Sequence, residues 1–153
     1  MNNFINFRGN KYFLSNTYPC NVKYKGYLYK SAEAAFQAQK NESHVYKYSL
    51  TFLDSKSAKR EGRRIDLIPN WDNMKDDIMF EVVKAKFEQN KDLMEKLLSI
   101  PDNELIEYNT WHDNYWGYCT CSKCKNKKKY NKLGKILSMI KEEQVKSISK
   151  GVE

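Results

Sequence analysis

The sequence lacks any long apolar run. No stretch of about 18 consecutive apolar residues occurs, so we expect no membrane-spanning helix. Residues 1–6 have neither the basic region nor the apolar stretch of a secretory signal peptide. Four cysteines without an export signal are typical of reduced thiols rather than of a disulfide framework. The sequence therefore predicts a cytoplasmic protein, and its 153 residues suit one domain.

Arginine is scarce, although the chain has a formal net charge of +8. Lysine outnumbers arginine 23 to 4, and asparagine occurs 15 times. This bias is typical of an AT-rich coding sequence, so the charge alone does not indicate phosphate binding. Six lysines do lie close together, between Lys123 and Lys132. This patch predicts either a solvated loop or a contact with nucleic acid.

Periodicity and turn residues predict a mainly helical α+β fold with a small N-terminal antiparallel sheet. Two alternating segments around Lys25-Gly26 predict a hairpin of residues 22–24 and 27–29. Ser31 is expected to cap a helix that continues to about Lys40. Further helices are expected over residues 45–53, 55–61, 70–89, 91–99 and from Asn131 as their cap to about residue 144.

The sequence also predicts where helices end and which segments are not helical. Gly62 is expected to end the helix over residues 55–61. A short strand is expected over residues 104–108, followed by a long loop over residues 110–132. Residues 145–153 form a polar tail that should fray, which leaves residues 1–144 as the domain. Near the start, the short apolar pieces 5–7 and 12–14 are separated by a turn.

The most informative segment runs from Phe13 to Lys40. Glu33, Gln37 and Lys40 recur at helical spacing, so one face of a short helix has a carboxylate, an amide and a lysine. The residues between them are mostly alanine, which is typical of a packed helix. A buried polar face needs partners, so this helix is a candidate site.

A second cluster of polar and aromatic residues spans residues 107–117. It contains two acids, two tryptophans and His112 within a segment that has no helical period. Tryptophans in a loop are costly to expose, so we expect them to cover a cavity or a ligand. This cluster is the second candidate site.

Taken in order, the motifs of the chain resemble those of the NADAR (YbiA-like) family. The matching segments are Phe7-Arg8-Gly9, Phe13-Leu14-Ser15-Asn16, Glu33, Phe36-Gln37-Ala38-Gln39-Lys40, Gly62-Arg63, Trp71, Met79, Lys86-Phe87, Gln89-Asn90, Asp113, Trp116-Gly117, Asn131 and Leu133-Gly134. The resemblance covers about residues 4 to 141. It implies a YbiA-like fold and an N-glycosidase that hydrolyses the N-ribosyl bond of a phosphorylated ribosyl compound.

The resemblance implies two kinds of substrate. One is an early intermediate of riboflavin biosynthesis, and the other is an ADP-ribose adduct such as ADP-ribosyl-guanine. The partner would then be a nucleotide-like small molecule or an ADP-ribosylated nucleic acid, with no membrane involved. The alternative is a non-catalytic module that binds NAD or ADP-ribose.

Two acids are the expected catalytic residues. Glu33 would activate water or stabilise the cationic sugar, although an acid in a first helical turn also serves the helix dipole alone. Asp113 would contact ribose hydroxyls, and its simpler interpretation is a turn before Tyr115. Both interpretations stay open for each acid.

A wider set of residues is expected to bind substrate. Arg8, Lys40 and Arg63 would contact phosphate, and the two arginines offer a fixed bidentate fork. Trp71 and Trp116 would stack on a planar base, unless they are core residues. The rest are Gly9, Ser15, Asn16, Gln37, Asn109, Gly117 and Asn131, several of which are equally typical of turns.

The chain departs from the family pattern at two points. Position 34, where the family usually has histidine, is Ala34. The other departure is a Cys-x-Cys-x-x-Cys motif in the long loop, which with a nearby histidine supplies four potential zinc ligands: His112, Cys119, Cys121 and Cys124. The spacing is not that of a standard zinc knuckle, so free thiols are the first interpretation and a structural zinc the second. No other cofactor is expected.

Overall fold

The computed structural model describes residues 7–151, so most of the apolar piece expected at residues 5–7 lies outside the described residues. The chain divides into two compact units. One unit comprises Asn16–Lys91, and the other comprises Met1–Ser15 together with Asp92–Glu153. Within the described residues, no helix is both long enough and apolar enough to cross a membrane.

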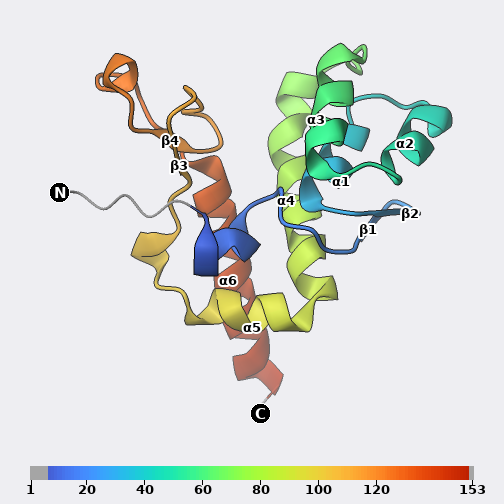
Figure 1. Cartoon of the computed structure of the whole chain (residues 1–153). Helices are drawn as coiled ribbons and strands as arrows, with labels where there is room; N and C mark the ends of the chain where they lie inside the picture. The colour runs from blue at the N-terminus through green and yellow to red at the C-terminus, as the bar shows by residue number, and fades with distance from the viewer. Residues whose placement is uncertain (1–6, 152–153) are drawn as a thin grey trace. The chain divides into compact units, whose positions relative to one another are not determined.

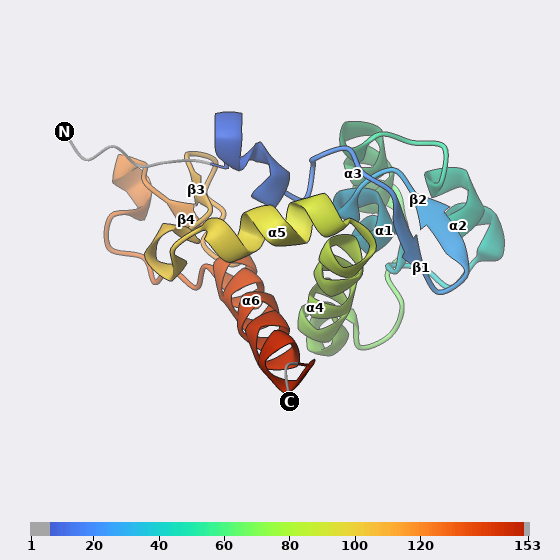
Figure 2. The ribbon, with the colours of Figure 1, turned by 90° about the horizontal axis from the view of Figure 1, so that it is seen from below.

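The first of these units, Asn16–Lys91, consists of a hairpin and four helices. Its elements are β1 (Val22–Tyr24), β2 (Tyr27–Tyr29), α1 (Ala32–Ala38), α2 (His44–Leu50), α3 (Ser55–Arg64) and α4 (Trp71–Gln89). Helix α1 lies among α3, α4 and the hairpin, as both ribbon views show (Figure 1 and Figure 2). The expected helices of this part of the chain and its small sheet are therefore confirmed.

The hairpin forms where its turn residues predict it. Strands β1 and β2 pair antiparallel, with Val22 opposite Tyr29. The two turn residues have positive φ angles, 46° at Lys25 and 88° at Gly26. A two-residue turn with this geometry matches the right-handed twist of the strands. Val22 and Tyr29 are fully buried, so the hairpin closes one side of the core of its unit.

Helix α1 is buried on all sides. The hydroxyl of Ser31 accepts a hydrogen bond from the backbone N–H of Ala34 at 3.1 Å, which confirms the predicted cap. Its alanines are small, and small side chains let neighbouring helices approach closely. The helix ends at Ala38, slightly earlier than expected. Polar side chains on such a helix are held by protein groups rather than by bulk water.

Gly62 corrects one sequence-based prediction. It does not end helix α3, which continues to Arg64, but lies buried inside it. A Cβ at position 62 would collide with the side-chain amide of Gln37 on α1. Glycine inside a helix costs roughly 1 kcal/mol relative to alanine. The close approach of α3 to α1 explains why glycine nevertheless occupies this position.

The other unit contains two longer helices and several short elements. These elements are the 3-10 helix η1 (Gly9–Leu14), α5 (Lys91–Ser99), η2 (Asp102–Glu104), β3 (Tyr108–Asn109), β4 (Tyr118–Cys119), η3 (Ser122–Cys124) and α6 (Lys132–Gly151). The first residue of α5, Lys91, belongs to the unit Asn16–Lys91. Strands β3 and β4 pair in parallel, with Tyr108 opposite Tyr118. The short strand or edge expected over residues 104–108 is therefore found only at Tyr108, because Glu104 ends the 3-10 helix η2 and residues 105–107 have no regular secondary structure. The expected loop over residues 110–132 is largely confirmed.

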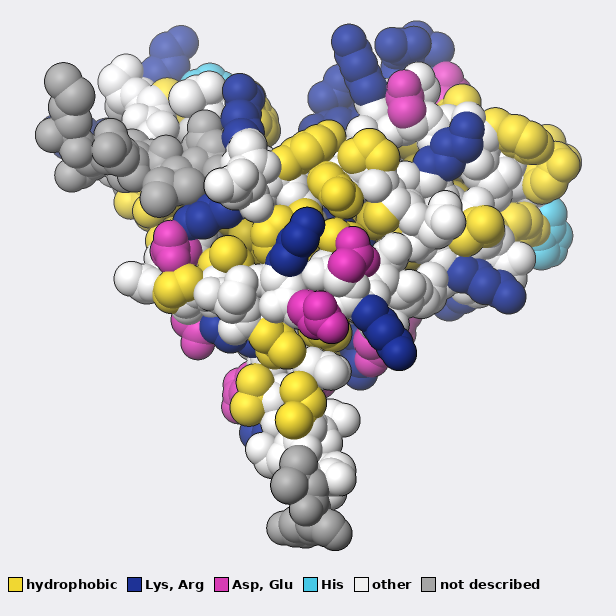
Figure 3. Space-filling view, turned by 60° about the horizontal axis from the view of Figure 1, so that its bottom comes forward, with side chains coloured by type: hydrophobic (Ala, Val, Ile, Leu, Met, Phe, Trp, Pro, Cys, Tyr) yellow, Lys and Arg dark blue, Asp and Glu magenta, His cyan; other side chains and the backbone are white. Residues whose placement is uncertain are grey.

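Helix α6 is longer than the sequence predicts. Its buried residues include Leu133, Leu137 and Ile140, as expected. The helix continues beyond Gln144 to Gly151, where the sequence predicts a frayed tail. Figure 3 shows hydrophobic side chains exposed on this last part of the chain, and Val145 is among the exposed ones. The domain boundary at residue 144 stays a prediction.

The contact between Gly62 and Gln37 generates a stability prediction. Gly62→Ala should lower the free energy of unfolding by about 1–3 kcal/mol, because the added methyl group displaces the Gln37 amide in an already packed interface. Urea denaturation measures this difference. Gly151→Ala is the matched control, since Gly151 is also helical and nothing lies near its missing Cβ. If Gly62→Ala is as stable as this control, the proposed close packing is incorrect.

Candidate active site

Glu33 is a buried acid on α1. Its side chain is only 8% exposed, and its backbone N–H donates to the carbonyl oxygen of Asn16 at 2.9 Å. The carboxylate oxygen Oε1 accepts a hydrogen bond from Nε2 of Gln37 at 2.9 Å. This is the i, i+4 pairing that the sequence predicts. Among the described residues, the Glu33 carboxylate accepts this one hydrogen bond, and its second oxygen, Oε2, has no hydrogen-bond partner.

Two buried amide oxygens lie close to this acid in the fold. Oδ1 of Asn16 and Oε1 of Gln37 have no hydrogen-bond partner within residues 7–151. The other amide atom of each residue is engaged, since Nδ2 of Asn16 donates to the sulfur of Met79 at 3.3 Å. An unsatisfied buried acceptor costs about 1–3 kcal/mol of stability. Such groups are therefore rare in folded proteins, and a ligand that would satisfy the acceptor is one explanation for them. Oε1 of Gln37 faces Gly62, whereas nothing among the described residues accounts for Oδ1 of Asn16.

Lys40 is a half-buried cation beyond the end of α1. Its Nζ donates to the carbonyl oxygen of Gly62 at 3.4 Å. Burial lowers the pKa of Lys40, and the negative charge of Glu33 opposes that shift. Three further cations lower the pKa of Lys40 again: Lys59, Arg63 and Lys75. Lys40 thus lies within electrostatic range of one carboxylate and three other positive charges, an environment that favours an anionic ligand.

Trp71 is placed in the core rather than on an open surface. Its side chain is 6% exposed, and its ring packs on Phe36 with centroids 5.3 Å apart. Trp71 is therefore a core residue, which is one of the two interpretations that the sequence leaves open. A role for Trp71 in stacking on a base stays a prediction.

Asp113 organises its own loop in the other unit. Its Oδ1 accepts hydrogen bonds from the backbone N–H groups of Tyr115 at 3.1 Å and Trp116 at 3.0 Å. This is the turn geometry that the sequence offers as the simpler interpretation. No contact described here gives Asp113 a catalytic role, which stays a prediction.

Two asparagines that are candidates for substrate binding also bind loop backbone. Asn109 is buried, and its Nδ2 donates to the carbonyl oxygen of Asp113 at 2.7 Å. Asn131 has a φ of 45° and precedes α6, but its side chain does not cap that helix. Its Nδ2 donates to Leu105 and its Oδ1 accepts from the N–H of Glu107. These amides therefore fix the loop.

The remaining candidates of this unit lie on turns or half-exposed surfaces. Gly117 is buried, and a Cβ there would press on the carbonyl oxygen of Glu107. Trp116 is half-buried and meets Tyr115 edge-on, with centroids 4.8 Å apart, whereas Trp111 is 57% exposed. The others belong to η1 and its ends: exposed Arg8 and Gly9, and half-buried Ser15.

The structure therefore groups the predicted residues in two sets, one in each unit. In the unit Asn16–Lys91 the set is Asn16, Glu33, Gln37, Lys40 and Arg63. In the other unit the set is Asn109, Asp113, Gly117 and Asn131. The sequence does not predict Lys59 and Lys75 as site residues, although both lie, like Arg63, within electrostatic range of Lys40. The i, i+4 spacing of Lys59 and Arg63 on α3 was the available signal.

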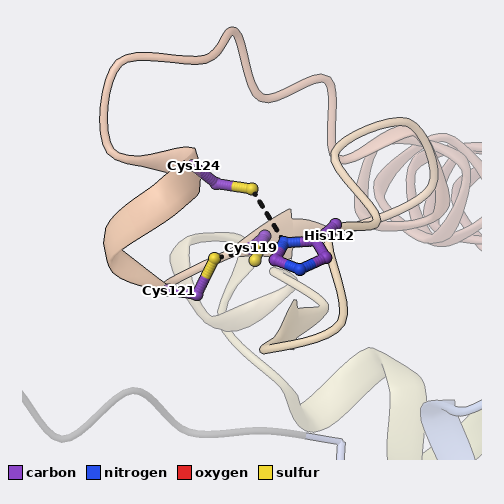
Figure 4. Close-up of side chains that lie close together, drawn as sticks. All are labelled: His112, Cys119, Cys121 and Cys124. Atoms are coloured by element: carbon purple, nitrogen blue, oxygen red, sulfur yellow. Dashed lines mark hydrogen bonds between the residues drawn. The ribbon is translucent and has the colours of Figure 1, made fainter.

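A group of potential metal ligands forms in the same unit as Asp113. The side chains of His112, Cys119, Cys121 and Cys124 converge (Figure 4), and their ligand atoms all lie within 4.8 Å of one another. All four cysteines of the chain are free thiols. The four side chains therefore form a cluster that is able to hold a metal ion.

Comparisons with known proteins agree with this fold. Residues 3–144 match the NADAR domain. The N-glycosidase YbiA of Escherichia coli (strain K12) is 33% identical over 125 residues, which covers 80% of this chain and 74% of YbiA. An N-glycosidase of Nostoc punctiforme is 30% identical over 135 residues, covering 84% of this chain and 83% of that protein.

Two further matches extend the comparison. A riboflavin biosynthesis protein of Vibrio vulnificus is 32% identical over 134 residues. That match covers 86% of this chain but only 35% of the relative, so the chain spans about a third of its length. The NMR structure of the E. coli protein YbiA superposes with a TM-score of 0.74 at 28% identity, covering 94% of this chain and 85% of that one. The chain belongs to the NADAR family and is an N-glycosyl hydrolase.

Proposed function

We propose that the enzyme hydrolyses the N-ribosyl bond of a phosphorylated ribosyl compound, with Glu33 as the catalytic carboxylate. The observation that carries this proposal is a buried acid with one oxygen held and the other available. Gln37 fixes Oε1 at 2.9 Å, and Oε2 has no hydrogen bond among the described residues. An acid fixed in this way does not need to reorganise when charge develops beside it.

The proposed reaction needs few protein groups. The bond between the anomeric carbon and nitrogen breaks, water supplies a hydroxyl group to that carbon, and the water proton goes to the leaving nitrogen. The sugar becomes cationic in the transition state, so a nearby carboxylate stabilises it or accepts the water proton. Position 34 is alanine, so that position cannot relay a proton. The proposed mechanism therefore assigns both tasks, stabilising the cationic sugar and accepting the water proton, to the carboxylate of Glu33.

Phosphate binding is proposed for the cations around Lys40. Lys40 and Arg63 are the expected contacts, and Lys59 and Lys75 add to the positive potential. A phosphate dianion among these cations would also reduce their mutual repulsion. The unpartnered Oδ1 of Asn16 is a suitable acceptor for a ribose hydroxyl group.

Two substrate classes fit this arrangement, because both contain a phosphorylated ribosyl group. An early intermediate of riboflavin biosynthesis is favoured by the name of the Vibrio vulnificus relative. An ADP-ribose adduct of a nucleic acid is favoured by the lysine patch between Lys123 and Lys132. The alternative of a non-catalytic module that binds NAD or ADP-ribose is disfavoured by the relatives that are named N-glycosidases. A cytoplasmic location stays a prediction.

The first prediction of this proposal concerns Glu33→Gln. We expect kcat/KM to fall by roughly 100-fold to 10,000-fold, because the amide retains the hydrogen bond to Gln37 but lacks the charge. The assay measures base or sugar released from the pyrimidine riboflavin intermediate, from NAD and from ADP-ribosylated guanine DNA. The substrate that wild-type protein turns over identifies the class.

The control for this experiment is Asp92→Asn. Asp92 is an exposed acid in the first turn of α5, so it shares the helix-dipole role but not the burial. Its substitution should leave turnover unchanged. Full activity in Glu33→Gln contradicts the catalytic role. Tight ADP-ribose binding without turnover of any of the three substrates by wild-type protein favours the non-catalytic module.

A second prediction compares two neighbouring arginines. Arg63→Met should raise KM by about 10-fold to 100-fold with little change in kcat, because a charge-assisted contact to phosphate is lost equally from the ground and transition states. Arg64→Met should leave both constants unchanged, since Arg64 is exposed, as Arg63 is, but lies near Glu61 instead of acting on Lys40. Steady-state kinetics distinguish the two. Equal effects of the two variants would refute a specific phosphate contact at Arg63.

A third prediction uses the coupling between Glu33 and Lys40. Burial lowers the pKa of Lys40, and the carboxylate of Glu33 raises it. Removing that charge in Glu33→Gln should therefore lower the pKa of Lys40 further. An NMR titration of the lysine side chain measures both values. An unchanged or raised pKa would show that the two side chains are not electrostatically coupled.

A further inference from the structure

The cluster of His112, Cys119, Cys121 and Cys124 does not belong to the unit that contains Glu33. It has no part in the proposed hydrolysis. Nδ1 of His112 is 3.2 Å from the sulfur of Cys121 and 3.4 Å from that of Cys124 (Figure 4). A tetrahedral zinc with bonds of about 2.3 Å to sulfur and about 2.0 Å to nitrogen separates its ligand atoms by roughly 3.5–3.8 Å. The observed spacing is close to these separations.

We propose that His112, Cys119, Cys121 and Cys124 bind one zinc ion as a structural site. Three sulfurs and one imidazole nitrogen form a complete tetrahedral set for zinc. Because four protein ligands leave no open coordination position, the ion would hold the loop rather than activate water. Binding replaces three S–H bonds with three zinc–sulfur bonds, and the three protons pass to solvent.

The backbone presents each ligand from a separately fixed position. Cys119 lies on β4, and its N–H donates to Oδ1 of Asn114 at 2.9 Å. Cys121 precedes the 3-10 turn η3 and Cys124 ends it, and a hydrogen bond from the N–H of Cys124 to the carbonyl oxygen of Cys121 at 3.1 Å closes the turn. His112 has a φ of 70°, a left-handed conformation that histidine adopts more often than most residues, and its ring lies close to the sulfurs (Figure 4). Cys119 and Cys124 are buried where the four ligands converge.

Charge around the cluster also suits this site. Zinc with three thiolates and a neutral histidine has a net charge of −1. The same loop is rich in lysine, and Nζ of Lys129 donates to the carbonyl oxygen of Cys124. The lysine patch therefore has a role in neutralising the site that does not require nucleic acid.

The ion would stabilise the loop that follows β3. Residues 110–131 contain only the short elements β4 and η3, and the rest of the segment is held by isolated backbone hydrogen bonds, such as that from the N–H of Tyr130 to the carbonyl oxygen of Asn114 at 2.8 Å. Asn109 and Asp113 fix part of this loop, and a metal would link His112 to residues 119–124. Metal removal should then loosen this unit without affecting the hydrogen bond between Glu33 and Gln37 in the other unit.

The test measures zinc in protein purified without a metal-affinity tag and under reducing conditions. Wild-type protein should contain about one zinc ion per chain, and so should Cys20→Ser, the matched control outside the cluster. Cys121→Ser and His112→Ala should lose the ion. A chelator should lower the Tm of wild-type protein and Cys20→Ser, and it should make three further thiols reactive.

Cobalt binding to wild-type protein makes the test independent of whether the variants fold. Co²⁺ should give the thiolate charge-transfer absorption and the intense visible bands of a tetrahedral site, and zinc should displace it. Far less than one zinc ion per chain, both as purified and after reconstitution, would overturn the proposal. So would stoichiometric zinc that Cys121→Ser retains, or Co²⁺ spectra without thiolate bands.

Discussion

The hydrogen bond between Gln37 and Glu33 is the interaction on which the candidate active site depends. A buried carboxylate is costly unless it has partners, and this bond supplies one at 2.9 Å. The bond requires Gln37 to lie against α3, and Gly62 provides the space for it there. The alanines of α1 allow the same close packing along the rest of the helix. One short helix, tightly enclosed, thus holds an acid in a defined position.

The two units use different means to fix their polar residues. Around α1 the means are helix packing and a cap at Ser31. In the other unit the loop is held by asparagine and aspartate side chains that bind backbone groups, as Asn109, Asp113 and Asn131 do. This loop has only short regular elements, so its stability depends largely on such contacts and, in our proposal, on a metal ion.

Local features were predictable from the sequence, whereas contacts between distant segments were not. The turn at Lys25-Gly26 and the cap at Ser31 depend on neighbouring residues, and both predictions are confirmed. The prediction that Gly62 ends a helix is wrong, because the contact of Gly62 with Gln37 is a tertiary one that neighbouring residues do not reveal. Asp113 and Asn131 belong to residue types that suit turns and ligands equally, so the sequence left both interpretations open. The four metal-ligand types were visible in the sequence because they lie within one loop, but only the fold shows that they converge.

The central claim is that Glu33 acts on the chemical step and not on binding. Its most direct test measures, for wild-type protein and Glu33→Gln, both the Kd of the ribose phosphate product and the single-turnover rate at saturating substrate. Our account predicts an unchanged Kd and a single-turnover rate lowered by roughly 100-fold or more. A weakened Kd with an unchanged single-turnover rate would contradict it, since the buried carboxylate would then serve binding alone.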